Sequence, residues 1–313
     1  MTALLEAIDV SVHFATRAGT VRAVEGVSLA VAAGEVLALV GESGSGKSTL
    51  GFTLAGLQSP TSGAVAYAGR GLDRAGWRSV RRDIQIVFQD PFGALDPRML
   101  VGDIIGEPLR VQQIGTAAER RARVMQLLDQ VGLPAESAQR FAHEFSGGQR
   151  QRIAIARALA PRPKLIVADE PLSALDVSVQ SQILNLLADI RAAEGLALLF
   201  ISHDLAVVHH LADRVAVLYL GHLVELASRD ELFERTAHPY TASLLAAVPR
   251  LGRKRTRGGL SGEMPSPLAP PSGCVFHPRC PKAQDLCAES APLLREVTSG
   301  HAVSCHFPLG GQG

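Results

Sequence analysis

The chain is poor in aromatic residues and has almost no net charge. Phe, Trp and Tyr make up 4% of its 313 residues, with a single Trp, and the formal net charge at pH 7 is +1. A chain so close to neutral has no electrostatic footprint for nucleic acid, so we expect no nucleic-acid partner. No uninterrupted apolar run approaches the roughly 18 residues that span a bilayer, and residues 1–6 lack a signal-peptide pattern. We therefore expect a cytosolic protein that reaches membranes only through partners.

Cysteine is also scarce, and it is confined to the C-terminal tail. The cysteines are Cys274, Cys280, Cys287 and Cys305. In a cytosolic chain such clustering favours metal binding over disulfides. Their spacing contains none of the close pairs typical of zinc sites, although His277, His301 and His306 could substitute. Four thiolates without a close pair can still enclose an iron–sulfur cluster, which leaves a cluster, Zn²⁺ and unligated thiols as the alternatives.

What the sequence does contain is a complete phosphate-binding loop of the pattern G-x-x-x-x-G-K-[ST]. Its residues are Gly41, Glu42, Ser43, Gly44, Ser45, Gly46, Lys47 and Ser48, with Thr49 following. The apolar run 36–40 before the loop suits a buried strand, and a helix is expected to begin near Lys47. Such a loop points N–H groups at phosphate oxygens, while Lys47 would reach the β- and γ-phosphates and Ser48 would hold Mg²⁺. The flanking patterns disfavour the alternative, a Gly-rich turn that binds nothing.

A second buried strand, 165–168, delivers Asp169 and Glu170 to its C-terminal end. Ligands bind at that end of the strands in open α/β sheets. Asp169 can therefore join the Mg²⁺ shell, and Glu170 can polarise an attacking water. By itself an acidic pair at a strand end is more often a solvated turn or a helix cap. The phosphate loop makes the nucleotide role the better interpretation.

Two other apolar strands also end in polar residues: 84–88 leads into Gln89, and 196–201 leads into Ser202-His203. Taken singly, Gln89 is an ordinary polar strand end and His203 a packing or helix-start histidine. A further segment consists of Ser146, Gly147, Gly148 and Gln149. Because it precedes a helical pattern, its N–H groups form an anion site at a helix N-terminus, which is compatible with a plain Ser N-cap.

The order of these motifs, together with Ser-Ala-Leu-Asp at 173–176, resembles that of the ATP-binding-cassette (ABC) ATPases over about residues 3–230. The resemblance implies a head-to-tail dimer with ATP sandwiched between one subunit's phosphate loop and the other's Ser-Gly-Gly-Gln segment. It also implies that Asp176 bridges the dimer, that His203 contacts the γ-phosphate and the attacking water, and that Gln89 links Mg²⁺ and water to the helical subdomain. The expected catalytic residues are Glu170, His203, Lys47 and Gln89, and the expected Mg²⁺ ligands are Ser48, Gln89 and Asp169.

The sequence does not identify which residue stacks on adenine. Cassette ATPases usually place an aromatic from the N-terminal sheet on the base, and Phe14 is the nearest candidate. Residues 15–20 look like an insertion that shifts the register, which leaves Val21 or Arg22 as alternatives, and Phe14 could equally face the core.

Strand-like and helix-like segments alternate, so the resemblance and the pattern agree on an α/β fold: a P-loop NTPase, ABC ATPase core with a mostly parallel sheet. Residues 4–14, 27–31 and 63–67 would supply an antiparallel portion. We expect an ABC nucleotide-binding domain over 1–235, with a helical subdomain at about 90–160, and a small Cys-containing extension over 236–313.

The rest of the chain resembles the ATP-binding subunits of bacterial oligopeptide and dipeptide importers, in the peptide/nickel transporter family. The resemblance rests on Phe-Gln-Asp-Pro at 88–91, a helix starting at 238–240, Gly-Glu-Met-Pro-Ser-Pro at 262–267 and the stretch 273–280. A helix ending near Val248 and a basic linker at 250–257 join these parts, and the linker is either solvated or close to an anionic membrane surface.

This second resemblance implies an ATPase that powers peptide import from the cytoplasmic face of the bacterial inner membrane. The implied partners are a second ABC ATPase subunit, two transmembrane permease subunits gripped by the helical subdomain and, indirectly, an extracytoplasmic substrate-binding protein. Some family members carry a [4Fe–4S] cluster on these four cysteines, which here would clip a core-poor tail. The alternatives are a regulatory cassette or a nucleic-acid-associated ATPase, but the latter would need an insertion or a second cassette, and neither is present.

Overall fold

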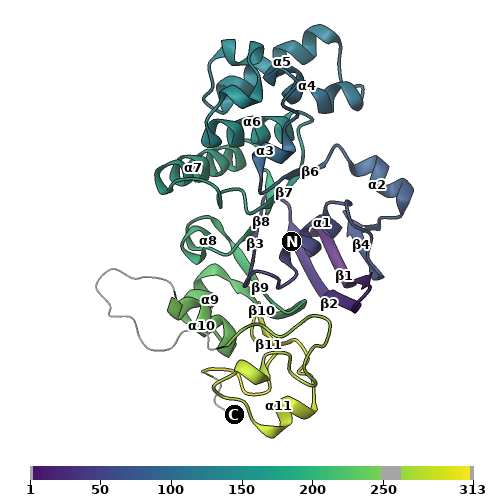
Figure 1. Cartoon of the computed structure of the whole chain (residues 1–313), viewed down its shortest axis with the longest axis vertical. Helices are drawn as coiled ribbons and strands as arrows, with labels where there is room; N and C mark the ends of the chain where they lie inside the picture. Colours follow the sequence, from purple (N-terminus) through teal and green to yellow (C-terminus); the bar gives the residue numbers. More distant parts are fainter. Residues whose placement is uncertain (1–2, 248–261, 311–313) are drawn as a thin grey trace.

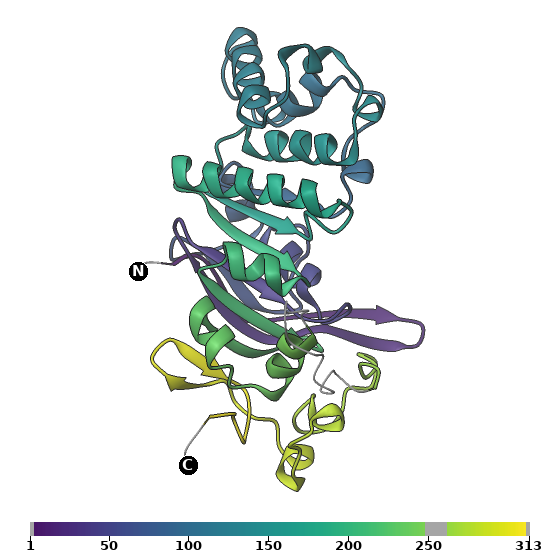
Figure 2. The same ribbon diagram turned by 90° about the vertical axis from the view of Figure 1, so that its left-hand side faces the viewer.

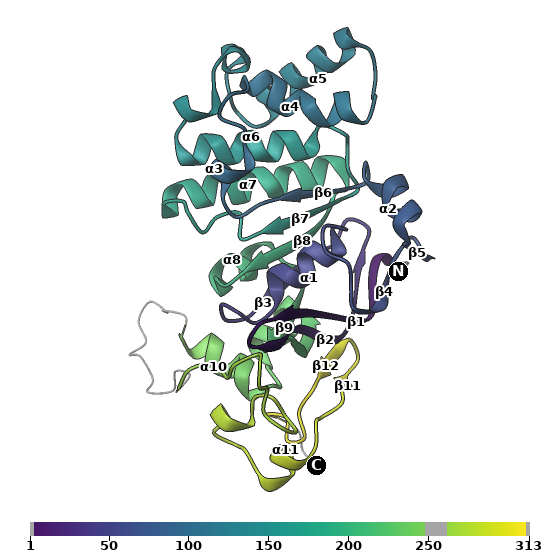
Figure 3. The ribbon, with the colours of Figure 1, turned by 45° about the vertical axis from the view of Figure 1, so that its right-hand side comes forward.

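The structure is a computed structural model that describes residues 3–247 and 262–310. Two sheets form the middle of an elongated molecule (Figure 1). Helices α4 (Val101–Val111), α5 (Ala117–Gln130) and α6 (Gly147–Leu159) form one end, and the residues after 262 form the other (Figures 1 and 3). No helix in the described ranges is both long and apolar enough to cross a bilayer.

The main sheet has the strand order β11-β12-β10-β9-β3-β8-β7-β6. Its strands are β3 (Val36–Val40), β6 (Ile84–Val87), β7 (Leu165–Asp169), β8 (Ala197–Ser202), β9 (Arg214–Tyr219), β10 (His222–Ser228), β11 (Arg295–Thr298) and β12 (His301–Val303). The central strands β9, β3, β8, β7 and β6 pair in parallel, whereas β10, β12 and β11 pair antiparallel. The predicted mostly parallel α/β core is confirmed.

The second sheet is antiparallel, as the sequence predicts, with the order β2-β1-β4-β5. Its strands are β1 (Ala3–Thr16), β2 (Gly19–Ala32), β4 (Ser62–Tyr67) and β5 (Arg70–Gly71). Residues 15–20 lengthen the β1–β2 hairpin, with Ala15 opposite Thr20 and Thr16 opposite Gly19. The tip of this hairpin projects from the body of the molecule (Figure 2).

The remaining helices lie between and beside the strands. They are α1 (Lys47–Leu54), α2 (Arg74–Val80), α3 (Pro91–Ala94), α7 (Val177–Glu194), α8 (Leu205–Leu211), α9 (Arg229–Glu234), α10 (Pro239–Ala247) and α11 (Asp285–Glu289), with 3-10 turns η1 (Ala135–Gln139), η2 (Ala142–Glu144) and η3 (His277–Arg279). Local signals set several ends: Thr116 caps α5 in a capping box with Glu119, and Gly195 ends α7 at φ 63°. The predicted end of α10 near Val248 and the basic linker lie outside the described residues.

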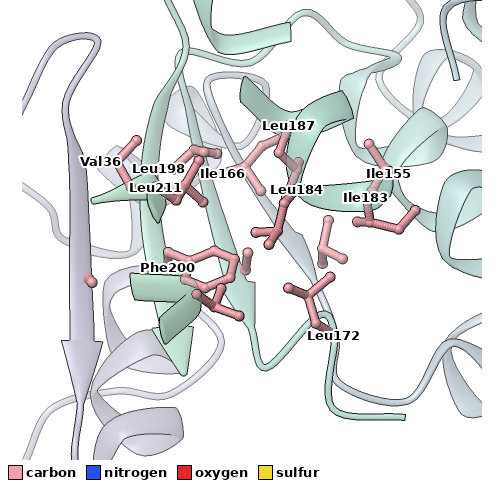
Figure 4. Packing of buried hydrophobic residues seen from close by; sticks show 14 of the residues in the cluster. Val36, Ile155, Ile166, Leu172, Ile183, Leu184, Leu187, Leu198, Phe200 and Leu211 are labelled. Carbon is pink, nitrogen blue, oxygen red and sulfur yellow. The ribbon is translucent and has the colours of Figure 1, made fainter. Parts of the chain in front are cut away.

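The core consists of two layers on the two faces of the main sheet. Alternate residues of β3 divide between them: Val36 and Val40 face one layer, and Leu37 and Leu39 face the other. In the first layer, strand residues such as Phe200 pack against Leu184 and Leu187 of α7 (Figure 4). Because both faces are covered, the strands read as continuous apolar runs. Their carboxyl ends are thereby fixed at one edge, where the site lies.

The tail contributes more to the core than the sequence suggests. Phe276 is 1% exposed and packs in the first layer with Cys274 and Cys287. Strand β12 extends the main sheet by pairing with β10, so the tail is joined to the core by backbone hydrogen bonds as well as by packing. The expectation of a core-poor tail is wrong, because Phe276 and β12 both join the main core.

Candidate nucleotide site

The phosphate loop lies between β3, which is buried throughout, and α1. Its backbone is curled: Gly46 has φ 99°, and a Cβ at this position would lie 2.2 Å from the carbonyl oxygen of Ala23. Both the dihedral and the contact require glycine. Within the loop, Gly41, Ser45 and Lys47 are buried, Ser43 and Gly44 are exposed, and Glu42, Gly46, Ser48 and Thr49 are partly buried.

The ammonium group of Lys47 is folded against the loop itself. Its Nζ donates to the carbonyl oxygens of Gly41 and Glu42, each at 2.8 Å, and the residue is 4% exposed. Burial lowers the pKa of Lys47, while the carboxylates of Glu170, Asp169 and Glu42 oppose that change. The group is therefore a desolvated cation with acceptors that phosphate oxygens can replace.

Two oxygen donors suited to Mg²⁺ meet beside the loop. Ser48 Oγ donates to Asp169 Oδ1 over 2.8 Å, although the residues are 121 positions apart. Burial raises the pKa of Asp169, and the bond from Ser48 opposes that rise. Hydroxyl and carboxylate oxygens are ligands that Mg²⁺ prefers. Gln89, the third predicted ligand, donates a hydrogen bond to Glu170, the residue that follows Asp169.

Glu170 forms the centre of the predicted catalytic group. Its Oε2 lies 3.3 Å from Gln89 Nε2 and 3.0 Å from His203 Nδ1, so three strand ends are brought together. The Glu170 side chain is 16% exposed and that of His203 is 59% exposed. Glu170 has φ 43°, a sparsely populated conformation for this residue type. A carboxylate held between an amide and an imidazole can orient a water and accept its proton.

The Ser-Gly-Gly-Gln segment is the N-terminus of α6. Ser146 Oγ accepts from Gln149 N, and Gln149 Oε1 accepts from Ser146 N at 3.0 Å, which makes a capping box. A Cβ on Gly148 would lie 2.4 Å from Cγ1 of Val179, so α6 and α7 approach closely there. Ser146 and Gln149 are exposed, whereas Gly147 and Gly148 are partly buried.

This segment is not brought to the phosphate loop of its own chain. Among the described residues no hydrogen bond or ion pair joins 146–149 to 41–49, and α6 belongs to the helical end of the molecule (Figures 1 and 3). Asp176, the predicted dimer bridge, is the N-cap residue of α7 and its side chain makes no cap hydrogen bond. The N-terminus of α6 thus lies apart from the phosphate loop of its own chain.

The candidates for adenine stacking lie on the projecting hairpin. Phe14 is 38% exposed and pairs with Val21 across the β1–β2 ladder. The neighbouring Arg22 N donates to the carbonyl oxygen of Pro267, so the tail reaches the same hairpin. Phe14 therefore does not face the core fully, and its role in stacking remains a prediction.

Sequence reasoning missed the contact between the tail and the phosphate loop. Arg279 forms two hydrogen bonds with the carboxylate of Glu42, and Tyr240 accepts a hydrogen bond from Glu42 N. Arg279 and Glu42 are 237 positions apart, and neither pattern nor spacing signals such a pair.

The four cysteines line one small cavity, of about 10 Å³, together with His238, His277 and His306. Burial raises the pKa of Cys305 to about 11, and it also raises those of Cys274 and Cys280, so these thiols are protonated at neutral pH. Within residues 3–247 and 262–310, no group of three or more His, Cys, Asp or Glu side chains is arranged to hold a metal ion. The sequence correctly groups the cysteines, but the structure does not show the predicted iron–sulfur or zinc site.

Comparison with known proteins agrees with this geometry. Residues 24–173 match the family model described as ABC transporter, and residues 224–287 match the model of the oligopeptide/dipeptide transporter C-terminal region. A putative peptide import ATP-binding protein of Brucella ovis is 51% identical, over 97% of this chain and 98% of the relative. The oligopeptide transport ATP-binding protein AppF of Bacillus subtilis is 48% identical, over 97% of each chain.

Solved ABC cassettes have the same fold. A dimeric ATP-binding cassette in a post-hydrolysis state, bound to ADP and Pi, is 31% identical with a TM-score of 0.66, covering 72% of this chain and 98% of that chain. The cbiO1 protein of Clostridium perfringens, part of an ABC transporter complex, is 30% identical with a TM-score of 0.66, covering 75% and 93%. The chain therefore belongs to the ATP-binding proteins of the ABC transporter family, as an ABC ATPase that carries the oligopeptide/dipeptide transporter C-terminal region.

Proposed function

We propose that this chain hydrolyses ATP to power the import of di- or oligopeptides through a membrane ABC transporter. The observation that carries the proposal is the convergence of Gln89, Glu170 and His203 beside the Ser48–Asp169 pair and the phosphate loop. The link to peptides is supported by the C-terminal region and by relatives named as peptide import ATP-binding proteins. We divide the chain into a nucleotide-binding domain at 1–235, with a helical subdomain at about 90–160, and an extension at 236–313.

In the proposed reaction each group has a separate task. Lys47 leaves the loop carbonyls and binds the β- and γ-phosphates, and Ser48, Asp169 and Gln89 would hold Mg²⁺, which neutralises phosphate charge when bound. Glu170 orients the attacking water and accepts its proton, and His203 contacts the γ-phosphate. Because Lys47 and Asp169 are buried, their electrostatic interactions are stronger than they would be in water.

The active form is a head-to-tail dimer with a second ABC ATPase subunit. Support comes from the exposed capping box at Ser146–Gln149, which lies apart from the chain's own loop, and from the dimeric solved cassette of similar fold. In that arrangement the positive end of α6 would bind the γ-phosphate held by the partner. Asp176, at the start of α7, would lie at the dimer interface.

Two permease subunits would dock on the side of the molecule between the sheet and the helical end. There a cleft of about 860 Å³ is lined by both parts of the molecule, including Arg78 of α2, Arg81 directly after it, and Pro108 and Val111 of α4. Val111 is 72% exposed, which suits an apolar partner helix. This partnership would place the protein on the cytoplasmic face of the bacterial inner membrane, with the extracytoplasmic substrate-binding protein reached through the permeases.

We also propose that the four cysteines ligate a [4Fe–4S] cluster. The donor set fits, because four thiols line one cavity and each would bind a different iron, so the thiols need not converge on one ion. The cavity is no larger than one water molecule, so the cysteine side chains must move apart to admit the cluster. Because iron is bound by thiolates, the thiols must also lose their protons on binding. Bound there, the cluster would contribute a structural cross-link between the turn at η3, helix α11 and the segment after β12.

The visible absorption spectrum of the purified protein tests the proposed iron–sulfur cluster. Protein purified without oxygen should be brown, with broad absorption near about 400 nm from thiolate-to-iron charge transfer, and each single Cys→Ser change should bleach it. Colourless protein that contains one zinc ion per chain would refute the iron–sulfur cluster and support a zinc site on the same cysteines. Metal-free protein with a protease-resistant extension would refute both.

The transport function is tested by isolating the chain from bacterial membranes with its neighbouring permease subunits and reconstituting the complex in vesicles. Wild-type complex should take up di- or oligopeptides only with ATP, and the Glu170→Gln complex should assemble but not transport. Failure to co-purify with any permease, or uptake that does not depend on ATP, would contradict the proposal.

A further inference from the structure

The C-terminal extension contacts the phosphate loop through an arginine–carboxylate fork. Arg279 Nη1 donates to Glu42 Oε2 at 2.7 Å, and Nη2 donates to Oε1 at 3.1 Å. The Arg279 side chain is 5% exposed and that of Glu42 is 28% exposed. Two parallel bonds of this kind fix both the position and the orientation of a carboxylate. The second residue of the loop is therefore held by a side chain from the far end of the sequence.

A third hydrogen bond joins the same extension to Glu42, through the Glu42 backbone. Its N–H donates to Tyr240 Oη over 2.9 Å, and Tyr240 is fully buried. The ring of Tyr240 packs edge-on against Tyr219 at 4.7 Å and is tilted against Phe276 at 5.4 Å. Tyr219 also accepts a bond from Arg279. These rigid aromatic contacts leave the two groups that hold Glu42 little freedom to move.

The charge of Glu42 matters to an anionic ligand. Glu42 lies in the loop that cradles phosphate, and its carbonyl oxygen accepts from the Lys47 ammonium at 2.8 Å. An unpaired carboxylate at this place would repel the phosphates and compete for Lys47. Arg279 supplies the compensating positive charge and draws the carboxylate toward the extension.

We propose that Arg279 is a positioning residue for nucleotide binding: by neutralising and fixing Glu42, it gives the C-terminal extension control over the ATP affinity of the phosphate loop. The proposal rests on the ATP-binding role of the loop and does not require a metal cluster. Because Arg279 immediately precedes Cys280, the cysteine cavity lies one residue from this contact. Changes in the cavity therefore have a short covalent path to the nucleotide site.

A merely structural role for Arg279 makes a different prediction. In that case its loss would loosen the extension whatever the charge at position 42. If Arg279 acts by compensating Glu42, removing the carboxylate should remove the need for the arginine. The two roles are therefore separated by a double-mutant cycle between Arg279→Ala and Glu42→Gln.

The experiment measures Mg²⁺-ATP binding to the full-length chain by calorimetry. Arg279→Ala should weaken ATP binding about tenfold, as expected for loss of a charge-assisted bond pair, and Arg279→Lys, which keeps the charge but loses the fork, about threefold. The matched control Arg295→Lys, on an exposed strand of the same extension, should stay within about twofold of wild type. In the ATPase assay the Arg279 variants should raise KM more than they lower kcat.

The double variant decides the question. In the Glu42→Gln background, adding Arg279→Ala should change ATP affinity less than about twofold, since no carboxylate is left unpaired. An undiminished tenfold loss in that background would overturn the proposal, as would unchanged affinity in Arg279→Ala by itself. If Arg279→Ala does not fold, Arg279→Lys measured with and without Glu42→Gln gives the same cycle, and equal losses in both backgrounds would likewise overturn it.

Discussion

Replacing His301 by alanine should detach the C-terminal strands from the main sheet. His301 Nε2 lies 2.7 Å from Oε1 of Glu225, a β10 residue whose side chain is fully buried. The same carboxylate accepts from the backbone N–H groups of Ala237 at 2.6 Å and His238 at 3.1 Å. Burial by itself would raise the pKa of Glu225, but the hydrogen bonds to its carboxylate, above all the bond from His301, outweigh burial, and the pKa is lowered. The carboxylate is therefore a buried charge that depends on its donors.

The magnitude follows from that dependence. Removing a hydrogen-bond donor from a buried group costs about 1–3 kcal/mol, and more when that group is charged, because its desolvation is no longer fully compensated. The backbone pairing of β12 with β10 is short, with Glu225 opposite Val303 and Leu226 opposite Ala302, so it offers little to offset the loss. We expect a cost of about 2–3 kcal/mol, since the backbone N–H groups of Ala237 and His238 and the hydroxyl of Thr236 still donate to the carboxylate.

Urea unfolding and limited proteolysis of the extension measure this cost. The control is His210→Ala, an exposed histidine of α8, which should change the free energy of unfolding by less than about 0.5 kcal/mol. Adding Glu225→Gln to His301→Ala should recover part of the loss, because an amide is cheaper to bury than a carboxylate. A His301→Ala cost below about 1 kcal/mol, or no recovery in the double variant, would refute the assignment of a buried, donor-dependent charge.

Three further predictions concern the core and the loop. Lys47→Ala should weaken ATP binding at least about tenfold in calorimetry, and an unchanged affinity would count against the phosphate-loop assignment. Gly46→Ala should abolish ATP binding while leaving the rest of the fold intact by circular dichroism, because its Cβ would lie 2.2 Å from Ala23 O; normal ATP binding would show that the loop tolerates another backbone path. The pKa of Glu225 is lowered from 4.5, so its contribution to the free energy of unfolding is full above about pH 4.5 and is lost as the pH falls through the lower pKa of the folded state. In Glu225→Gln the free energy of unfolding should therefore fall less at acidic pH than it does in wild type, as measured by urea unfolding at several pH values; an equal fall would contradict this role.

The nucleotide site could be predicted from sequence because its signals are local. Gln89, Glu170 and His203 each follow an apolar strand, and parallel strands bring their carboxyl ends to one edge. That is why Gln89 and His203, far from Glu170 in the chain, both lie within hydrogen-bond distance of the Glu170 carboxylate. The antiparallel sheet was likewise predicted, over residues 4–14, 27–31 and 63–67.

The arrangement of the extension could not be predicted in the same way. Strand β12 has three residues, too few to show a periodic pattern, and its His301 contacts the buried Glu225 of β10, 76 positions away. The fork between Arg279 and Glu42 joins positions 237 apart, and no local rule connects them. Tertiary packing of the tail, not its own propensities, decides both features.

The most direct test of the central claim is ATP turnover and dimerisation of the Glu170→Gln variant. The site geometry predicts that this change abolishes hydrolysis, because it removes the water-polarising carboxylate, while the phosphate loop and Lys47 still bind ATP. With Mg²⁺-ATP the variant should therefore sediment as a stable dimer, and wild type should do so only transiently. Near-normal ATPase activity in Glu170→Gln, or a variant that stays monomeric while saturated with ATP, would contradict the account.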